Sequence, residues 1–443
     1  MRQYSRMFCS SRIPLRGRDK IALSADIPAD QQHAVVLRGD RAYRIRVLDK
    51  DGATVTEAGL RSALEKLLSE PVSCDPSRLV SSLTSLERDT WASVRADLEQ
   101  IPVNRATLSA IDSALFVVVL DASSPCDAAA ASSHALHGAS GALDPRWFDK
   151  SMQLLVAPDG QFGVNFEHSW GDGACVGRFV QEVVSDMDGV PSGFPPLSDP
   201  AAFSDAALEP LRWDLSDAIR ARISDASRAL VASADGMESA VLQFDRFGKD
   251  FSKKNKMSPD ALVQMAFQLA AWQQSGRVLP TYESCNMQHF HCGRTDAIRS
   301  ASGDAKSMAQ GWARADNAQR RALLSAATAR QEQLTKETRE GKGFDRHLYA
   351  LRFRAKETGR AEHEFFSSTA YQTLNSNLLS TSTVSLPSLR LAGFGPVHAD
   401  GFGVAYAIHN NELAFNITSF RKGTAVQFAD ALEKALSDIE NMF

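Results

Sequence analysis

The stretch "LLVAPDGQFGVNFEHSWGDGACVGRFVQEVV" (residues 154–184) gives the strongest indication of the fold class, because its pattern predicts a pair of strands, a sharp turn and the start of a helix. Apolar, alternating segments flank Pro158-Asp159-Gly160, which predicts a β-hairpin that turns at this tripeptide. Gly171 and Gly173 then let the backbone turn sharply. Apolar residues follow at helical spacing, namely Val176, Phe179, Val180 and Val183. The stretch therefore predicts a strand–turn–helix unit within an α/β layer.

His168 stands at the end of the second predicted strand, on the same face as Phe162, Val164 and Phe166. An apolar face by itself favours a buried core histidine. The glycines that follow instead place His168 at the end of a strand, where active-site groups often lie, and would make it a general base. Asp172, four residues on, could fix the loop or influence the imidazole. The stretch alone does not decide between the two interpretations.

Length and composition set wide limits on the class of protein. The 443 residues are enough for two domains of ordinary size. A net charge of −4 gives no global positive field for nucleic acid. The six cysteines lack CxxC spacing, so we expect free thiols and no metal site. The apolar run at 114–120 is too short to span a bilayer and is interpreted as a buried strand.

Patterns elsewhere in the chain mix strands and helices in both halves, which predicts α/β layers with partly antiparallel sheets. The predicted elements of the first half are a hairpin at 34–48, helices at 59–68 and 79–99, and a loose surface loop at 123–145. A segment rich in proline, glycine and serine at 189–205 is the best candidate for a domain boundary. The predicted elements after it are strands at 239–245, 378–385 and 401–418 and helices at 259–275, 317–339 and 424–440.

Four lysines, Lys249, Lys253, Lys254 and Lys256, crowd the residues just before a predicted helix start. Ser258 is a favourable N-cap and Pro259 suits the first helical position. A lysine run is usually a solvated basic loop. A helix N-terminus, however, is a ready anion site, so the same run also fits a phosphate-rich ligand. Both interpretations stay open at this point.

Hydroxyl side chains gather in two further stretches, residues 281–302 and 379–408. In the second, alternation places Ser380 and Ser382 on one face of a strand and Thr381 and Thr383 on the other. Polar residues without any catalytic role would give the same pattern, so no reaction can be assigned from these residues alone.

Taken together, these stretches resemble the choline/carnitine acyltransferase family, most closely its mitochondrial palmitoyl-transferring branch. The segments that carry the resemblance are "NFEHSWGDG" (165–173), "KKNKMSPDA" (253–261), "TYESC" (281–285), "HCGRTDAIR" (291–299), "GKGFDRHL" (341–348), "LSTST" (379–383) and "DGFGVAY" (400–406). The resemblance implies two sandwich domains of the chloramphenicol acetyltransferase type, with mixed and largely antiparallel sheets and an active-site tunnel at their interface. We expect a catalytic-histidine domain at 1–208 and a coenzyme A/carnitine domain at 209–443.

The family's activity is the reversible transfer of a fatty acyl group between coenzyme A and L-carnitine. By resemblance, His168 is the general base, Ser382 stabilises the oxyanion, and Asp172 is a further catalytic residue. No permanently bound cofactor is implied, since coenzyme A is a co-substrate. The alternatives are a medium-chain carnitine acyltransferase and a non-catalytic remnant that binds acyl-CoA.

The resemblance also assigns binding residues. The coenzyme A site matches Lys249, Lys253, Lys254, Lys256, Met257, Ser258, Pro259 and Asp260. The carnitine carboxylate matches Tyr282, Ser284, Thr295 and Arg346, and the trimethylammonium matches Phe394 and Ser380. Ala392 and Gly393 are small where short-chain members have a bulky residue that plugs the acyl tunnel, so a long acyl chain is expected.

The first 18 residues carry five arginines and look like a transit peptide by composition. They match an internal segment of the family, so we expect no targeting peptide here and a chain that lacks the family's N-terminal third. The family implies a location on the matrix side of the mitochondrial inner membrane. It also implies peripheral membrane association through a segment in that missing third, and no nucleic-acid partner.

Overall fold

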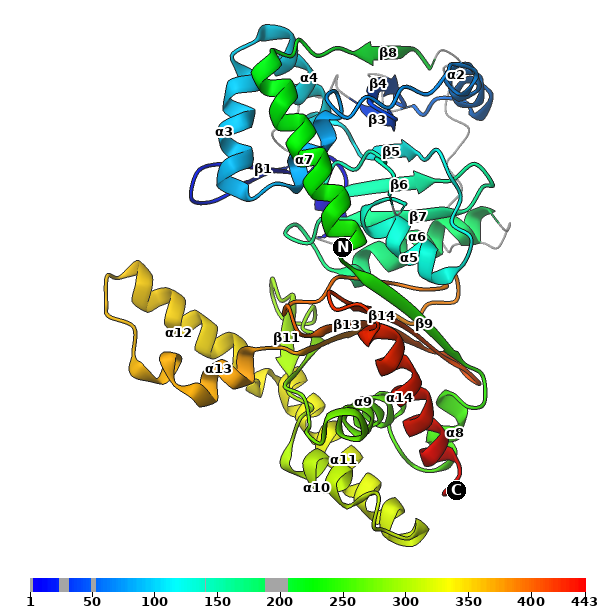
Figure 1. Cartoon of the computed structure of the whole chain (residues 1–443), viewed down its shortest axis with the longest axis vertical. Coiled ribbons are helices and arrows are strands. Elements are labelled where there is room, and N and C mark those ends of the chain that lie inside the picture. Colours follow the sequence, from blue (N-terminus) through cyan, green and yellow to red (C-terminus); the bar gives the residue numbers. More distant parts are fainter. Residues whose placement is uncertain (1–2, 24–31, 49–52, 140, 188–205) are drawn as a thin grey trace. The chain divides into compact units, whose positions relative to one another are not determined.

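The computed structural model describes residues 3–23, 32–48, 53–139, 141–187 and 206–443. The chain forms two compact units, Met1–Asp235 and Gly236–Phe443 (Figure 1). The predicted boundary between residues 208 and 209 falls within a strand, β8 (Leu208–Leu211). This strand pairs with the sheet of the first unit, so the chain divides 27 residues later than predicted. The predicted linker at 189–205 lies outside the described residues.

The described residues of the first unit form a six-stranded mixed sheet with the order β7-β6-β5-β3-β4-β8. Besides β8, its strands are β3 (His33–Arg38), β4 (Arg41–Arg46), β5 (Val117–Leu120), β6 (Met152–Val156) and β7 (Phe162–Phe166). The β3–β5 and β5–β6 pairings are parallel and the other three are antiparallel. A separate two-stranded ribbon pairs β1 (Ser11–Ile13) with β2 (Lys20–Ala22).

Helices cover both faces of this sheet. They are α1 (Tyr4–Met7), α2 (Glu57–Ser69), α3 (Arg88–Glu99), α4 (Pro102–Ser113), α5 (Ala128–His137), α6 (Gly173–Met187), α7 (Asp217–Asp235) and the 3₁₀ helix η2 (Val80–Ser85). Alternate residues of β3 separate two cores, because side chains of a strand point to opposite faces. Val35 packs with Trp91 of α3 and Ile223 of α7, whereas Val36 packs with Leu67 of α2.

The second unit repeats the same sheet pattern. The order of its six described strands is β11-β10-β12-β13-β14-β9, again with two parallel pairings followed by antiparallel ones. The strands are β9 (Glu238–Phe244), β10 (Thr281–Asn286), β11 (Thr295–Ile298), β12 (Leu379–Thr383), β13 (Phe402–Ile408) and β14 (Leu413–Ser419). This repetition confirms the expectation of two α/β domains of similar fold with mixed, largely antiparallel sheets.

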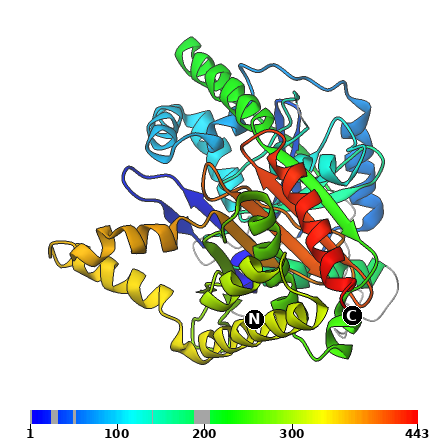
Figure 2. The ribbon, with the colours of Figure 1, turned by 60° about the horizontal axis from the view of Figure 1, so that its bottom comes forward.

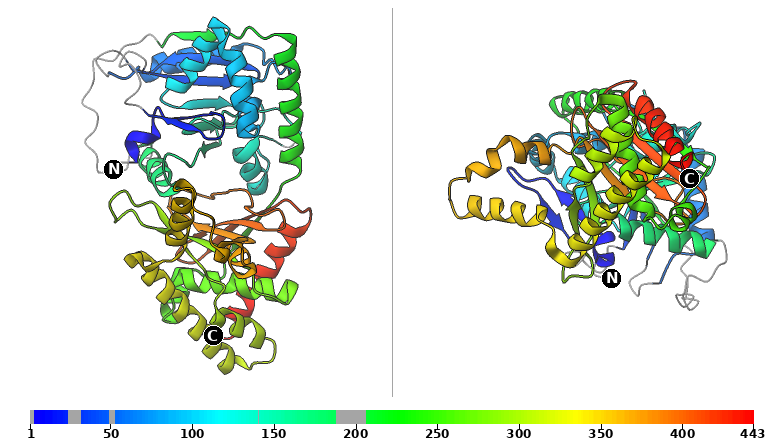
Figure 3. Two further views of the ribbon diagram at one scale, coloured as in Figure 1. Left: turned by 90° about the vertical axis from the view of Figure 1, so that its left-hand side faces the viewer. Right: turned by 90° about the horizontal axis from the view of Figure 1, so that it is seen from below.

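The helices of the second unit leave one face of its sheet to loops. They are α8 (Lys249–Lys254), α9 (Pro259–Ser275), α10 (Gly303–Gly311), α11 (Asn317–Glu337), α12 (Asp345–Glu357), α13 (Thr369–Asn375) and α14 (Thr424–Glu440), with the shorter η3 (Thr338–Lys342) and η4 (Glu364–Ser367). Helices α9 and α14 pack on the same face as one core (Figures 1 and 2). The α12–α13 pair projects from the rest of this unit (Figure 3).

Most predicted elements are confirmed where local signals are strong. Helix α9 begins at Pro259, its N-cap Ser258 accepts a hydrogen bond from the Ala261 N–H at 3.3 Å, and Gly276 ends it at a φ of 68°. The hairpin at 34–48 and the helix at 424–440 are also confirmed. The segment 79–99 is instead broken into η2 and α3, and the segment 401–418 is two strands, β13 and β14.

The predicted loose loop at 123–145 is wrong, because the segment contains α5. Asp127 caps this helix by accepting from the Ala130 N–H at 2.7 Å, and Gly138 ends it at a φ of 100°. Alanine has the highest helix propensity, and this outweighs the missing apolar periodicity. No helix among the described residues combines the length and apolarity needed to cross a membrane.

Candidate functional site

His168 lies in the bend that follows β7, two residues after Phe166 ends the strand. Its side chain is exposed, and its ring centroid lies 5.5 Å from that of Phe166. The core-histidine interpretation is therefore wrong. The face that suggested it is only partly covered, because β7 is the edge strand of its sheet and Phe162 is 53% exposed.

Buried neighbours fix the turn that carries His168. The indole N–H of Trp170 donates to the Ser151 carbonyl at 2.9 Å. Asp172 is 5% exposed, and Gln3 bonds it twice, through its side-chain amide to Oδ2 at 2.8 Å and through its oxygen to the Asp172 N–H at 3.2 Å. The Asp172 carbonyl also accepts from the Cys175 N–H in the first turn of α6. Asp172 therefore fixes the loop, as the sequence suggested.

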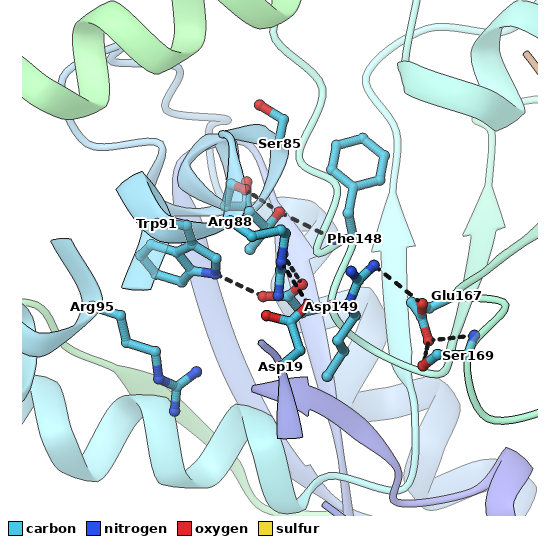
Figure 4. Close-up of polar contacts among 12 residues, drawn as sticks. Asp19, Ser85, Arg88, Trp91, Arg95, Phe148, Asp149, Glu167 and Ser169 are labelled. Carbon is cyan, nitrogen blue, oxygen red and sulfur yellow. Dashed lines mark hydrogen bonds and ion pairs between the residues drawn. The ribbon is translucent and has the colours of Figure 1, made fainter. Parts of the chain in front are cut away.

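On the other side of His168, a chain of charged groups holds Glu167 (Figure 4). Glu167 accepts hydrogen bonds from the N–H and hydroxyl of Ser169. Arg12 lies 3.5 Å from Glu167 and also pairs with Asp19. The exposed His168 therefore lies between Glu167 on one side and Trp170 and Asp172 on the other. Contacts with distant parts of the chain fix the positions of these neighbours.

Arg88 continues this chain of charges into the core. It donates to Asp19 at 2.9 Å and to Asp149 at 2.7 Å, and Asp149 also accepts from the Trp91 indole at 2.7 Å (Figure 4). Burial raises the pKa of Asp149 to about 6, against the opposing effects of Arg88 and the Trp91 N–H. A buried carboxylate needs such partners to stay ionised. Residues so far apart in sequence give no local signal, and sequence reasoning missed them.

Replacing Arg88 with methionine is expected to destabilise the first unit by about 3 kcal/mol, because Asp149 loses the cation that compensates its burial. This corresponds to a fall of roughly 6–12 °C in the melting temperature of that unit, measured by calorimetry. The matched control is Arg61→Met, which removes an exposed pair with Glu57 on α2. A shift no larger in Arg88→Met than in this control would show that the charge chain contributes nothing to stability.

The open face of the second sheet gathers hydroxyl groups. Parallel pairing of β10 with β12 sets Tyr282 beside Ser380, and the hydroxyls of Ser284 and Ser382 lie 3.2 Å apart. Thr381 points to the opposite face, where its hydroxyl accepts from the Gln264 amide at 3.0 Å. The predicted division of these hydroxyls between two faces is confirmed.

Arg346, at the start of α12, reaches the same face. Its guanidinium donates to the Tyr282 hydroxyl at 3.2 Å and to the Thr295 carbonyl at 3.2 Å, and lies 5.9 Å from the centroid of the Tyr282 ring. Asp345 also pairs with it at 3.1 Å, while bonding the buried Arg299. Arg346 is 45% exposed, so its charge remains accessible beside two hydroxyl-bearing residues.

The loop with Ala392, Gly393 and Phe394 lies on this face as well. The Ala392 carbonyl accepts from the Asn416 amide at 3.1 Å, and the Phe394 carbonyl accepts from the Thr418 hydroxyl at 2.7 Å. The strand register sets Asn416 and Thr418 in line with Ser382 and Ser380 across β13. A Cβ at Gly403 would lie 2.6 Å from the Phe394 carbonyl oxygen, so the close approach of this loop needs a glycine.

The lysine-rich segment includes a short helix, α8. Lys249, Lys253 and Lys254 lie on α8, and Lys256 follows at a φ of 59°. All four lysines are exposed, whereas Met257 is 8% exposed and anchors the segment. The start of α9 therefore carries exposed positive charge directly before its N-terminus.

The structure thus places most predicted residues in three groups. The group in the second unit comprises Tyr282, Ser284, Thr295, Arg346, Ser380, Ser382 and the loop 392–394, and the lysine-rich segment lies at the α8–α9 junction of that unit. His168 and Asp172 form the group in the first unit. A hydroxyl pair and a guanidinium suit an anionic or carbonyl substrate, and an exposed imidazole suits proton transfer.

Three buried side chains that sequence reasoning did not single out also converge in the first unit. Asp121, His134 and Asp144 have ligand atoms within 4.8 Å of one another. Arg146 donates to both oxygens of Asp121, at 2.7 and 3.1 Å, and His134 Nε2 lies 2.9 Å from the same carboxylate. Asp121 is thus paired with a guanidinium, and Asp144 accepts from the Ala139 N–H at 2.8 Å, so we interpret the cluster as a structural network of ion pairs and hydrogen bonds.

Comparison with known proteins identifies relatives over nearly the whole chain. The family described as Choline/Carnitine o-acyltransferase matches residues 1–434. The mitochondrial carnitine O-palmitoyltransferase 2 of Rattus norvegicus is 41% identical over 99% of this chain and 66% of its own length, and that of Homo sapiens is 39% identical with the same coverage. The carnitine O-acetyltransferase of Rattus norvegicus is 30% identical over 100% of this chain and 72% of its own length.

The chain spans 66% of the length of these palmitoyltransferases. Among solved structures, a chloramphenicol acetyltransferase is similar with a TM-score of 0.25 and 9% identity, covering 45% of this chain and 88% of that one. This structural likeness is too weak to carry an argument, and the fold rests on the two repeated sheets.

Proposed function

Because the chain belongs to the choline/carnitine O-acyltransferase family, we propose that it transfers a long-chain acyl group reversibly between coenzyme A and L-carnitine. The observation that carries this proposal is the group formed by Tyr282, Arg346 and the Ser284–Ser382 pair on one face of the second sheet. It offers both a cation for a carboxylate and hydroxyls for a developing oxyanion.

The carboxylate of carnitine would bind at Arg346. A guanidinium donates two parallel hydrogen bonds to a carboxylate, and Arg346 is held beside Tyr282 and Thr295, whose hydroxyls can add further bonds. Ser284 completes this set. The trimethylammonium group would lie beside Ser380 and the ring of Phe394, because an aromatic face favours a quaternary ammonium ion.

His168 would act as the general base. It would take the proton of the carnitine hydroxyl as the oxygen attacks the thioester carbonyl. The tetrahedral intermediate would then break its C–S bond, and the departing coenzyme A thiolate would take the proton back from the imidazolium. In the reverse direction the imidazole would take the proton of the coenzyme A thiol. Both substrates use the same imidazole, so no covalent intermediate on the protein is needed. Asp172 would serve by holding the loop, and a fixed imidazole is what general-base catalysis requires.

Ser382 would stabilise the oxyanion of the tetrahedral intermediate. Its hydroxyl is held by the Ser284 hydroxyl at 3.2 Å on a strand in the middle of the sheet. A donor whose position is fixed before the reaction needs little reorganisation when charge develops on the carbonyl oxygen.

Coenzyme A would bind along the α8–α9 junction. Lys249, Lys253, Lys254 and Lys256 would pair with its phosphates, and residues 257–260 would contact the rest of the molecule. Exposed lysines on a helix that leads directly into a second helix N-terminus support this proposal, since both features favour negative charge. Coenzyme A acts as a co-substrate, and no resident cofactor is proposed.

A long acyl chain is favoured over acetyl by the small residues Ala392 and Gly393. Each methylene buried is worth about 0.8 kcal/mol, so an open path for the chain selects strongly for length. A medium-chain preference is the alternative. Turnover with palmitoyl-, octanoyl- and acetyl-CoA distinguishes them, because the long-chain proposal requires the highest kcat/KM with palmitoyl-CoA. We further propose a mitochondrial location, which the names of the palmitoyltransferase relatives support. Within the mitochondrion, the matrix side of the inner membrane is proposed from the family resemblance alone.

The Arg346→Gln variant tests the acceptor site. We expect the KM for carnitine to rise on the order of 10–100-fold, because a charge-assisted hydrogen-bonded pair with the carboxylate is lost. The KM for palmitoyl-CoA should stay within about twofold, since acyl-CoA binds elsewhere. Steady-state kinetics with each substrate varied in turn measures both constants. The matched control is Arg354→Gln, an exposed arginine further along α12. Equal KM values for carnitine in the two variants would remove Arg346 from the acceptor site.

A further inference from the structure

A buried glutamate meets a partly exposed aspartate behind the hydroxyl-bearing face of the second sheet. Glu283 lies in β10 between Tyr282 and Ser284, but its side chain points to the opposite face, toward the helices, and is 4% exposed. There it is hydrogen-bonded to Asp260, in the first turn of α9. The hydroxyl of Tyr406 donates to Asp260 Oδ1 at 2.6 Å.

Amide and hydroxyl groups extend this pair into a buried polar layer between α9, α11 and the sheet. Gln331 of α11 donates to Glu283 Oε2 at 2.5 Å. Gln264 of α9 donates to Thr381 at 3.0 Å and to Tyr406 at 3.1 Å. The Thr381 hydroxyl in turn donates to the Tyr282 carbonyl at 3.0 Å. The layer therefore joins the start of α9 to both β10 and β12.

The charge state of the pair follows from its burial. Burial raises the pKa of Glu283 well above its ordinary value, and the neighbouring Asp260 carboxylate raises it further. Because the two carboxyl groups are hydrogen-bonded to each other, one proton must lie between them, and burial favours it on Glu283 as the donor to Asp260. Asp260 then receives two O–H donors, from Glu283 and Tyr406, which fix it at the helix start.

We propose that Glu283 is a positioning residue that locks the acyl-CoA segment at the start of α9 to the strand carrying the acceptor residues Tyr282 and Ser284. This role rests on the proposed function, in which Asp260 contacts coenzyme A. Glu283 touches neither substrate. It acts through Asp260 on one side and through the β10 backbone on the other, so its loss loosens the coenzyme A segment first.

Two variants separate the hydrogen bond from the charge. Glu283→Gln keeps an N–H donor for Asp260 and an oxygen within reach of Gln331, whereas Glu283→Met keeps the volume and removes the donor. We expect the dissociation constant for coenzyme A to rise about tenfold in Glu283→Met and to stay within about twofold of wild type in Glu283→Gln.

Gln268→Met is the matched control for general damage to this layer. Gln268 lies on α9, is fully buried and bonds Thr281 at 2.6 Å, but belongs to a separate set of contacts. We expect it to lower the melting temperature while coenzyme A affinity stays within about twofold of wild type. If Gln268→Met lost affinity for coenzyme A tenfold, as Glu283→Met is expected to, a specific role for Glu283 would be overturned.

The pH dependence of coenzyme A binding gives a further readout. The groups that face Glu283 are Asp260, Tyr406 and Gln331, with Cys285 two residues along the same strand; burial and Glu283 raise the pKa of Cys285 to about 11. A raised pKa in the folded state means that the stabilisation is present at low pH and lost as pH rises through that pKa. Wild-type affinity should therefore fall at alkaline pH more steeply than that of Glu283→Gln.

The experiment is isothermal titration of the whole chain with coenzyme A alone, with folding checked by circular dichroism. A tenfold loss in Glu283→Met, rescued in Glu283→Gln and with a flatter pH profile there, supports the positioning role. Equal affinity of wild type and Glu283→Met would overturn it and leave the proposed function standing. If neither wild type nor Glu283→Met bound coenzyme A, the proposed function would be overturned, and the role of Glu283 with it.

Discussion

Replacing His168 with alanine is expected to slow the carnitine-dependent release of coenzyme A from palmitoyl-CoA by ~10²–10⁴-fold. The imidazole is exposed at the end of β7, while Trp170 and Asp172 on one side and Glu167 on the other fix the loop by separate contacts. The substitution therefore removes the base without removing the contacts that hold the loop. The rate is measured by trapping the free thiol with a chromogenic reagent.

Folding and binding serve as controls for this variant. Coenzyme A affinity and the melting temperature should match those of wild type, because an exposed side chain contributes little to either. His363→Ala, which removes another exposed histidine, from the residue before η4, should keep full activity. If His168→Ala retained more than about a tenth of the wild-type rate, another group would have to be the base.

Replacing Ser382 with alanine is expected to lower kcat by ~10²–10³-fold, with the KM values for both substrates within a few-fold of wild type. The hydroxyl is proposed to bind the oxyanion, which exists only in the tetrahedral intermediate, so its loss acts on the chemical step. Rapid-quench measurement of a single turnover isolates that step from product release.

Thr383→Ala is the matched control, since Thr383 is the next residue of β12 and its side chain points to the opposite face. We expect it to retain activity within about twofold. Ser284→Ala should lower kcat less than Ser382→Ala does and should also raise the KM for carnitine, because it removes both the partner of Ser382 and a proposed contact of the carboxylate. A Ser382→Ala variant with a changed KM for carnitine and an unchanged kcat would instead make Ser382 an acceptor-binding residue.

Local patterns predicted the elements that carry the site. The turn at Pro158-Asp159-Gly160, the Ser258 cap and the alternation at Ser380 and Ser382 each act over a few residues, and each is present as expected. Such signals depend on backbone conformation and on nearest neighbours in the chain, so they can be read from sequence.

Features that depend on distant contacts could not be predicted in the same way. The stretch around His168 could not decide between a core residue and an exposed one, because nothing in its strand shows that β7 lies at the edge of a sheet. The chain of charges from Arg12 through Arg88 to Asp149 joins residues more than sixty positions apart. The Glu283–Asp260 pair likewise forms only when α9 packs on β10. Tertiary packing decides each of these contacts.

The most direct test of the proposed function is to incubate the wild-type chain with palmitoyl-CoA and carnitine and to quantify palmitoylcarnitine and free coenzyme A by mass spectrometry. The proposal predicts both products in equal amounts, neither of them without carnitine, and the reverse reaction from palmitoylcarnitine and coenzyme A. Free palmitate released without carnitine would show a hydrolase. A folded chain that binds coenzyme A but forms no palmitoylcarnitine would contradict the proposal and indicate a binding protein.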